Sequence, residues 1–533
     1  MTERARRIWK RIGIAVLVTV AVFFVVGEIV LHRATPILKG RIIETLSTRF
    51  GGKVELDDLN VSLGRGLEIT GQGLRIFPAE AVVAAGANQP LIGVRNFHFH
   101  SGVIGLFFKP MHVGSVKVTQ MAINIPPRQM RQQAPKRESK HRGKIKIVVD
   151  EIICDDSRLV IGTDKPDKDP KTFLLRHIEL HDVGPKAPWQ YTATLVNAVP
   201  RGDIHAKGTF GPWRNDSPGD SSVTGHYTFE HADLNTIKGI GGILSSTGEF
   251  KGQLNRIAVH GTTKTPEFSL DTANHPVPLV TKFDAIVDGT SGDTYLQPVE
   301  GKLGQTNLTV RGAVINIKGV GHREDLDVDV SAGAIENFLD LAVKTQPPVL
   351  TGIINTKFKL IIEPGTESVT RKLKSRGAFE VDRIHFTNRS VQDKVDMLSL
   401  RARGEPKEAK PGAEDVNSFL KGEFAIEEGK IIFTQLNYAL PGAQVNLSGV
   451  YSMDGQQFDF SGKVLTKATL RNMVASWWKS WLLTPVSPFF KKDGAGAEIP
   501  VRIDGTRSEP KFGLNLFRDS DQNKGHKKDQ GKE

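Results

Sequence analysis

The pattern of hydrophobic and polar positions changes twice along this chain, and each change predicts a different structure. Residues Ile12 to Leu31 form an apolar stretch in which Glu28 is the first charged residue. About twenty residues at roughly 1.5 Å per residue span ~30 Å, the thickness of a hydrocarbon core. We therefore predict a transmembrane helix at residues 12–31. Its predicted anchoring side chains are Ile12, Leu17, Phe23, Phe24, Val26 and Leu31.

The residues before this stretch form a basic stub, residues 1–11, with five Lys or Arg side chains. Because short flanks rich in Lys and Arg stay in the cytoplasm, we predict a single-pass protein with a cytoplasmic N-terminus and most of the chain across the membrane. A cleaved signal peptide and twin-arginine export are the alternatives. The segment Val25 to Ile29 has no small-x-small cleavage site, which favours an uncleaved anchor.

A short segment with helical periodicity follows the apolar stretch. Its apolar residues recur every four positions, which places them on one helical face, and Gly51 comes next as a stop signal. These residues are Leu38, Ile42, Leu46 and Phe50.

From Val54 onward the period falls to two, and this alternation fills most of the remaining chain. It predicts a mainly β protein of mostly antiparallel strands with short turns. A polar-Gly-x-apolar unit recurs at irregular spacing, which excludes a fixed-period solenoid and indicates one kind of strand used many times. The glycines of this unit are Gly208, Gly225, Gly248, Gly312, Gly377, Gly422 and Gly449.

Three segments interrupt the alternation. A basic segment without periodicity predicts a disordered loop, and Ile335 to Lys344 has the spacing of a short amphipathic helix. A second helix is predicted around Trp477, Trp478 and Trp481, either as a cap on the sheet core or as a gate that contacts the membrane. The predicted organisation is a stub at 1–11, a transmembrane helix at 12–31, a membrane-proximal region at 32–127, a basic loop at 128–144, extended β-structure at 145–469, the Trp-rich helix at 470–492, terminal strands at 493–517 and a disordered tail at 518–533.

The distribution of charged residues limits the classes of binding partner that the sequence predicts. The net charge of +12 is partly local, because the stub and the segment from Arg128 to Lys146 are rich in Lys and Arg. Neither carries a nucleic-acid recognition motif, so we expect no nucleic-acid partner. The single cysteine, Cys154, lies in an apolar run and is predicted to be a buried thiol.

Each group of residues that could act in catalysis or metal binding is better explained as an ordinary part of a strand or turn. We therefore expect that the protein is not an enzyme and has no cofactor. His98 and His100 are predicted to lie on one face of a strand, but no third metal ligand follows at a spacing typical of a metal-binding motif. The cluster from His226 to Asp233, which includes Glu230 and His231, is typical of strand ends and turns. Asp288 to Asp293 is predicted to be a turn, because the chain has neither a Gly-x-Ser-x-Gly elbow nor a Walker motif.

Two segments resemble the AsmA family of bacterial envelope proteins. Leu46 to Leu74 contains a Gly-x-x-Val-x-Leu strand motif followed by Ser-Leu-x-x-Gly-Leu-x-Ile, and Val113 to Pro127 is similar to the family's next block. The resemblance covers roughly residues 10 to 130 and implies an inner-membrane anchor with a long, twisted, open β-groove for lipid acyl chains. The family is similar in architecture to the chorein-type bridge proteins of eukaryotes. The candidate groove-lining residues are Leu67, Ile69, Leu74, Ile76, Phe210, Phe250, Phe358, Phe379 and Phe424.

The expected function is therefore phospholipid binding and transport from an anchor in the bacterial inner membrane, with most of the chain in the periplasm and a further envelope protein as a partner. The alternative to a groove is that the apolar strand faces pack on each other as sandwiches. Two other functions remain open. One is a periplasmic scaffold that assists outer-membrane protein assembly by strand addition, and the other is an envelope hydrolase.

Overall fold

The structure is a computed structural model that describes residues 35–48, 50–63, 66–102, 111–127, 129–130, 147–163, 169–214, 217–271, 275–317, 320–343, 346–453, 457–473, 496–506 and 510–514. The protein is mainly β, as the alternation predicts. It divides into two compact units: unit 1 is Met1–Thr236 with Ser245–Ile257, and unit 2 is Ile237–Leu244 with Ala258–Glu533. No helix in the described ranges is both long and apolar enough to cross a membrane. The predicted span at residues 12–31 lies outside those ranges.

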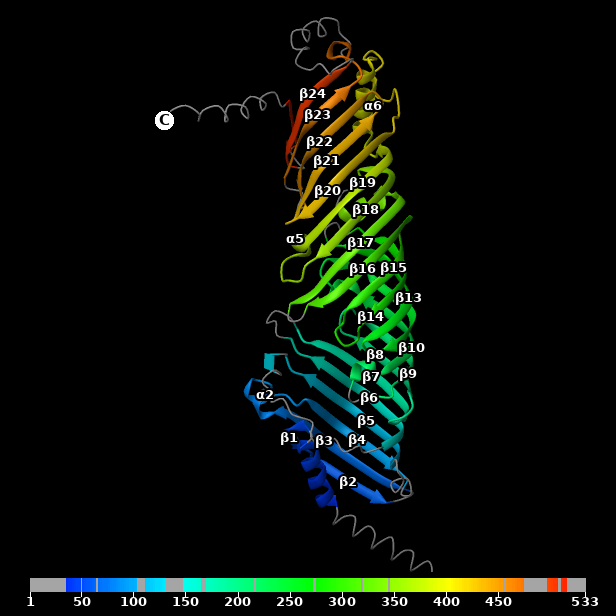
Figure 1. The fold of residues 1–533 in the computed structure, drawn as a ribbon, viewed down its shortest axis with the longest axis vertical. Helices are drawn as coiled ribbons and strands as arrows, with labels where there is room; N and C mark the ends of the chain where they lie inside the picture. The colour runs from blue at the N-terminus through cyan, green and yellow to red at the C-terminus, as the bar shows by residue number, and fades with distance from the viewer. Residues whose placement is uncertain are drawn as a thin grey trace, which may run out of the picture. The chain divides into compact units, whose positions relative to one another are not determined.

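Unit 1 is a twisted sheet of strands that mostly pair with their sequence neighbours (Figure 1). Its elements are β1 (Gly52–Glu55), β2 (Asp58–Leu63), β3 (Leu67–Ala79), α2 (Glu80–Ala84), β4 (Ile92–Ser101), β5 (Met111–Ile125), β6 (Ile147–Ile161), β7 (Lys171–Val183), β8 (Trp189–Asn197), β9 (Arg201–Phe210), η2 (Pro218–Asp220), β10 (Ser222–Asp233), η3 (Leu234–Thr236) and most of β12 (Ile243–Gln253).

One pairing in unit 1 departs from the predicted meander. β5 and β6 run parallel, with Met111 opposite Ile147 and Ile125 opposite Ile161. A parallel pair needs a crossover connection of a dozen or more residues, and the chain between β5 and β6 includes the predicted basic loop 128–144. Most of that loop lies outside the described residues, so the structure does not test its predicted disorder.

A helix at residues 35–48 packs on the sheet of unit 1, where helical periodicity predicts one. Its Ile42 and Ile43 contact the cluster of Leu56, Leu59 and Val61. The predicted face is only partly used: Leu38 and Phe50 are 39% and 38% exposed, because the contact is centred one residue further along the helix.

Kinks in the strands keep apolar side chains on one face even where their spacing is odd. Ile69 and Leu74 both pack on the same cluster, and Gly73 between them has a φ of +66°. In β6, Asp156 has a φ of +47°, and the Cys154 Sγ and Ser157 Oγ atoms on either side of it are 3.1 Å apart. Strict period-two counting would have placed each of these pairs on opposite faces.

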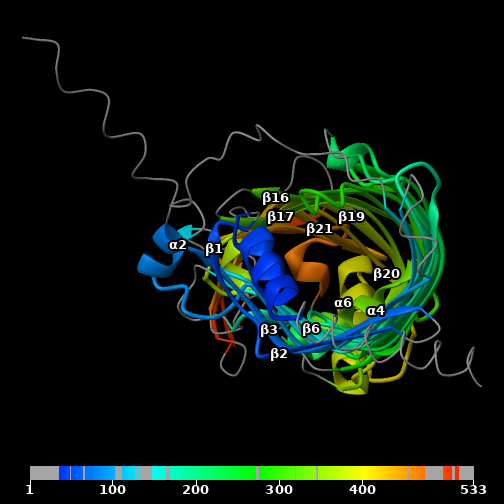
Figure 2. The same ribbon diagram turned by 90° about the horizontal axis from the view of Figure 1, so that it is seen from below.

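Unit 2 is an antiparallel sheet with two helices on its concave side, α4 and α6 (Figure 2). Its elements are β11 (Ile240–Gly241), most of β13 (Arg256–Leu270), β14 (Val277–Val287), β15 (Thr294–Leu303), β16 (Thr306–Ile317), β17 (Gly321–Ala334), α4 (Ile335–Ala342), β18 (Leu350–Ile362), α5 (Val369–Lys372), β19 (Leu373–Phe386), α6 (Arg389–Arg403), β20 (Ser418–Glu427), β21 (Lys430–Leu440), β22 (Ala443–Ser452), β23 (Phe458–Thr466), η4 (Leu470–Met473), β24 (Ala497–Gly505) and β25 (Pro510–Leu514). Helix α4 coincides with the amphipathic helix predicted from Ile335 onward.

Helix α6 was not predicted and is a further helix, after α4, within the mainly β region 145–469. Its buried face is partly polar: Gln392, Asp396 and Ser399 are fully buried, next to the buried apolar residues Leu400 and Ala402. The Gln392 side chain donates to Asp396 Oδ1 at 2.8 Å and to the Val416 carbonyl oxygen at 3.0 Å. The polar residues weaken the apolar helical pattern that Val391, Val395, Leu398 and Ala402 would otherwise form.

The core of unit 2 lies where α4 meets the sheet. Val330, Ile354, Val381 and Ile384 form a buried cluster, and Phe338 of α4 packs against it. Helix α4 therefore covers the concave face of the sheet at this cluster.

Replacement of Ile384 by Ala should lower the free energy of unfolding by roughly 2–5 kcal/mol, because the side chain is 1% exposed and its removal leaves a cavity. Urea unfolding followed by circular dichroism measures the change. The control is Ile315→Ala, at a position that is 37% exposed, where we expect a change within about 0.5 kcal/mol. Equal losses in the two variants would contradict this assignment of the core.

Candidate functional site

Six phenylalanines form a continuous line of ring contacts on the concave face of unit 2. Adjacent ring centroids lie 5.9 to 6.4 Å apart, within the range of favourable aromatic pairs. In order of contact the rings are Phe358, Phe424, Phe379, Phe433, Phe460 and Phe458. We call this set the phenylalanine strip. All six side chains are only half-buried, so the strip is accessible as well as apolar.

Glycines on neighbouring strands make room for the rings. Phe424 is opposite Gly377 and Phe379 is opposite Gly422 in the β19–β20 ladder. A Cβ atom at position 422 would lie 2.9 Å from the Phe379 ring, and one at position 449 would lie 2.7 Å from the Phe460 ring. At Gly422 and Gly449 the Gly-x-apolar unit therefore leaves room for a ring of the adjacent strand, whereas at Gly208 and Gly312 an added Cβ would meet backbone atoms.

The rest of this concave face is also apolar. The ladders place Val328 beside Phe358, Leu326 beside Leu360, and Leu447 beside Leu436. Hydroxyl groups on the face are satisfied internally: Ser375 Oγ donates to the Lys359 carbonyl oxygen at 2.8 Å, and Tyr438 Oη donates to Ser418 Oγ at 2.9 Å. Burial raises the pKa of Tyr438. Among the described residues of strands β16 to β24, the titratable side chains with a charge or an imidazole on this face are Glu324 and His322, both at the start of β17.

The convex face of the same strands carries a ladder of ion pairs. Lys357 pairs with Asp329 at 2.8 Å and Lys359 with Asp325 at 2.7 Å, and the hydrogen bond to Asp325 raises the pKa of Lys359. Further pairs join Lys421 to Glu380, Lys463 to Glu498 and Arg502 to Asp459. Each exposed ion pair contributes only about 0–1 kcal/mol to the stability of the fold. The main effect of the ladder is therefore to make the convex face hydrophilic.

Unit 1 shows the same division between its two faces. On the concave side, Phe97 is opposite Val118 and Leu195 is opposite Ile204. The Tyr227 and Phe250 rings lie 6.4 Å apart. On the convex side, His98 is opposite Lys117.

The nine predicted groove-lining residues all lie on the concave face of their own unit. In unit 1 they belong to the surface that also carries helix 35–48, and in unit 2 three of them, Phe358, Phe379 and Phe424, belong to the phenylalanine strip. Phe433, Phe458 and Phe460 were not predicted, although Phe458 and Phe460 alternate with polar residues in β23; Phe433 directly follows Ile432, so alternation does not single it out. The predicted anchor residues at 12–31 and the three tryptophans Trp477, Trp478 and Trp481 lie outside the described residues.

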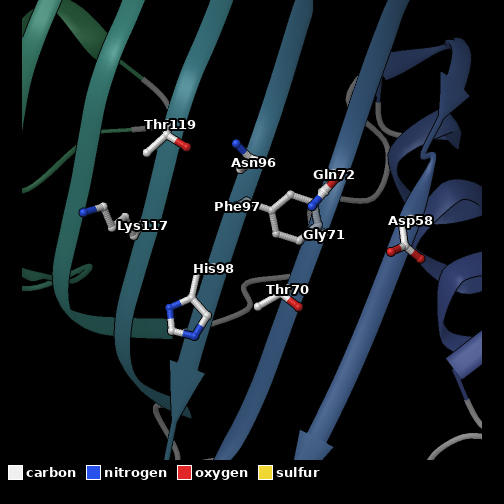
Figure 3. Close-up of a pocket in the computed structure, with 9 residues that line it drawn as sticks. All are labelled: Asp58, Thr70, Gly71, Gln72, Asn96, Phe97, His98, Lys117 and Thr119. Carbon is white, nitrogen blue, oxygen red and sulfur yellow. The ribbon is translucent and has the colours of Figure 1, made fainter.

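The surface hollows among the described residues are wide and lie along strand surfaces. One of about 340 Å³ lies on β2 to β5, and Figure 3 shows the Phe97 ring next to Gly71 there. Its lining residues are Asp58, Thr70, Gly71, Gln72, Asn96, Phe97, His98, Lys117 and Thr119. Another of about 470 Å³ lies over the ion-pair ladder at Asp327 and Lys359.

The residues that the sequence analysis considered for chemistry do not converge on one centre. His226 pairs with Glu249 at 3.7 Å, whereas His231 pairs with Asp203 at 3.5 Å. His100 pairs with Glu68 at 3.6 Å.

Two further sequence predictions are confirmed. The segment beginning at Asp288 is a turn, in which the Asp288 Oδ1 atom accepts hydrogen bonds from Thr290. Cys154 is buried, and burial raises the pKa of its thiol. These residues therefore have structural roles in the described part of the chain.

A scan against protein-family models found no match, and searches of curated proteins and of solved structures found none either.

Proposed function

We propose that this protein binds phospholipid through its acyl chains, which lie along the concave apolar faces of the sheets. The observation that carries the proposal is the phenylalanine strip, a row of accessible rings backed by a charged convex face. A monomeric protein rarely leaves such a surface exposed to water unless it has a ligand or partner.

The dimensions and energies suit an acyl chain. The strip crosses β18 to β23, which is five strand spacings, or roughly 24 Å at ~4.8 Å each. One leaflet of a bilayer core is about 15 Å thick, so the strip is long enough for one chain. Each buried methylene contributes about 0.8 kcal/mol, and no single side chain has to dominate the binding.

The setting is part of the same proposal. The apolar stretch at residues 12–31 and the resemblance to the AsmA family support an inner-membrane anchor with the sheets in the periplasm. In that setting the protein acts as a non-enzymatic lipid carrier for the cell envelope.

A phospholipid with a photoactivatable diazirine at the end of one acyl chain tests the proposal. The full chain, purified in mild detergent, is irradiated with this lipid, digested and analysed by mass spectrometry. We expect crosslinked peptides from β18 to β23, centred on Phe379, Phe424 and Phe433. Crosslinks confined to residues 12–31 would contradict the proposal, because they report only lipid around the anchor.

The same preparation tests the scaffold alternative. Strand addition would leave unfolded outer-membrane protein chains bound to sheet edges. Recovery of such chains without phospholipid would favour the scaffold and overturn the lipid-carrier proposal.

A further inference from the structure

The convex face of unit 1 holds a group of metal-ligating side chains that the sequence does not reveal. Glu151 of β6 is directly opposite His181 of β7, and Glu179 lies two residues before His181 on the same face. The ligand atoms of these three residues all lie within 4.8 Å of one another. His181 Nε2 is already 2.9 Å from Glu179 Oε1.

The charge balance of this group differs from that of the ion-pair ladder in unit 2. There, carboxylates such as Asp325 and Glu380 are paired with lysine. Here the nearby Lys117 pairs with Asp155 instead, at 3.3 Å. The side chain of Glu151 forms no hydrogen bond or ion pair with a described residue, and the partners of the Glu179 carboxylate are imidazoles.

On the described strands, the residues directly beside this group are neither lysine nor arginine. Ser115 of β5 lies beside Glu151, and Gln190 and Thr192 of β8 lie beside His181 and Glu179. Two carboxylates that face each other without Lys or Arg repel, and a bound cation would relieve that repulsion.

We propose that Glu151, Glu179 and His181 form a zinc-binding site. One imidazole and two carboxylates are a donor set that suits Zn²⁺, with a water molecule as the fourth ligand. Zinc bonds of about 2.0–2.2 Å require ligand atoms closer together than they are here, and side-chain rotation provides this because all three residues are partly exposed. The hydrogen-bonded ladder between β6 and β7 holds the two backbones in place.

His177 supports the site from the next position on this face. Its Nε2 atom lies 3.8 Å from Glu179 Oε2, and its Nδ1 atom lies 2.7 Å from Asp155 Oδ1. The hydrogen bond to Asp155 fixes the His177 ring beside Glu179, where the imidazole is close enough to help orient that carboxylate. The proposal does not depend on lipid binding.

Zinc titration of the full chain tests the site. The protein is purified in detergent, stripped with EDTA and titrated with Zn²⁺ by isothermal calorimetry. We expect one site with a micromolar or lower Kd, and at least a tenfold weaker Kd in His181→Ala and in Glu179→Gln. The control is His226→Ala, because His226 has Glu249 as its single acidic partner at 3.7 Å.

Three results would overturn the proposal. The first is the absence of saturable binding to the parent chain, and the second is unchanged binding in His181→Ala. The third is an equal loss in His226→Ala, which would assign the zinc to scattered surface histidines. Circular dichroism of each variant verifies that the sheet is retained.

Discussion

Phe424→Asp should reduce phospholipid crosslinking to the phenylalanine strip at least tenfold. The Phe424 ring lies in the middle of the strip and contacts both Phe358 and Phe379 at 6.2 Å between centroids. Loss of a phenylalanine forfeits about 1.5–3 kcal/mol of apolar contact, and an unpaired carboxylate that an acyl chain must cover costs several kcal/mol more. Since about 1.4 kcal/mol corresponds to a tenfold change in affinity, tenfold is a lower bound. Quantitative mass spectrometry of crosslinked peptides measures it.

A charge on the same strand but on the other face is the matched control. Ala425 is the next residue and lies opposite Arg376 on the convex face, so Ala425→Asp places its carboxylate beside a guanidinium group. We expect this variant to bind lipid as the parent chain does. Phe424→Leu, which remains apolar, should also retain binding. Normal lipid binding in a folded Phe424→Asp variant would remove this strip from the proposed path.

Alternation along single strands is sufficient to predict the two faces of the sheet. In β18, Phe358 and Leu360 alternate with Lys357 and Lys359. The register with β17 then places the two apolar residues opposite Val328 and Leu326, and the two lysines opposite Asp329 and Asp327. The sequence therefore identifies the class of structure and the concave residues of many strands. This is possible because the alternation of apolar and charged residues within a single strand is enough to assign its side chains to the two faces.

Features that depend on pairing between distant strands could not be predicted in this way. The parallel pairing of β5 with β6 involves a connection that has no periodicity. The zinc ligands Glu151 and His181 are 30 positions apart and meet only through the β6–β7 register. Helix α6 was missed for a different reason: part of its buried face, at Gln392, Asp396 and Ser399, carries polar side chains.

The glycine pattern gains a physical explanation from the strand register. As a sequence signal, Gly-x-apolar indicates bends or close approaches without saying what comes close. At Gly422 and Gly449 a close neighbour is an aromatic ring of the adjacent strand, whereas at Gly208 and Gly312 the close neighbours are backbone atoms. In the phenylalanine strip, β19 and β20 each supply one ring and place a glycine opposite another, which gives a row of rings.

Gly377→Val should lower the free energy of unfolding by roughly 3 kcal/mol, the upper end of the usual cost of overpacking. Gly377 is opposite Phe358 in the β18–β19 ladder and opposite Phe424 in the β19–β20 ladder. A Cβ atom at position 377 would collide with the Phe358 Cβ atom and would lie 2.8 Å from its Cα atom. Because backbone atoms are involved, ring rotation alone cannot relieve the clash, and the two strands must separate locally. Urea unfolding followed by circular dichroism measures the loss.

The neighbouring position provides the control for valine itself. Ala378 is exposed on the convex face, so Ala378→Val adds the same side chain to the same strand without meeting Phe358. We expect its stability to change by no more than about 0.5 kcal/mol. Equal stabilities of Gly377→Val and Ala378→Val would show that the rings do not require glycine beneath them. A selective loss in Gly377→Val would instead tie this glycine to the packing of the phenylalanine strip, because both variants end with the same valine side chain but on opposite faces of β19.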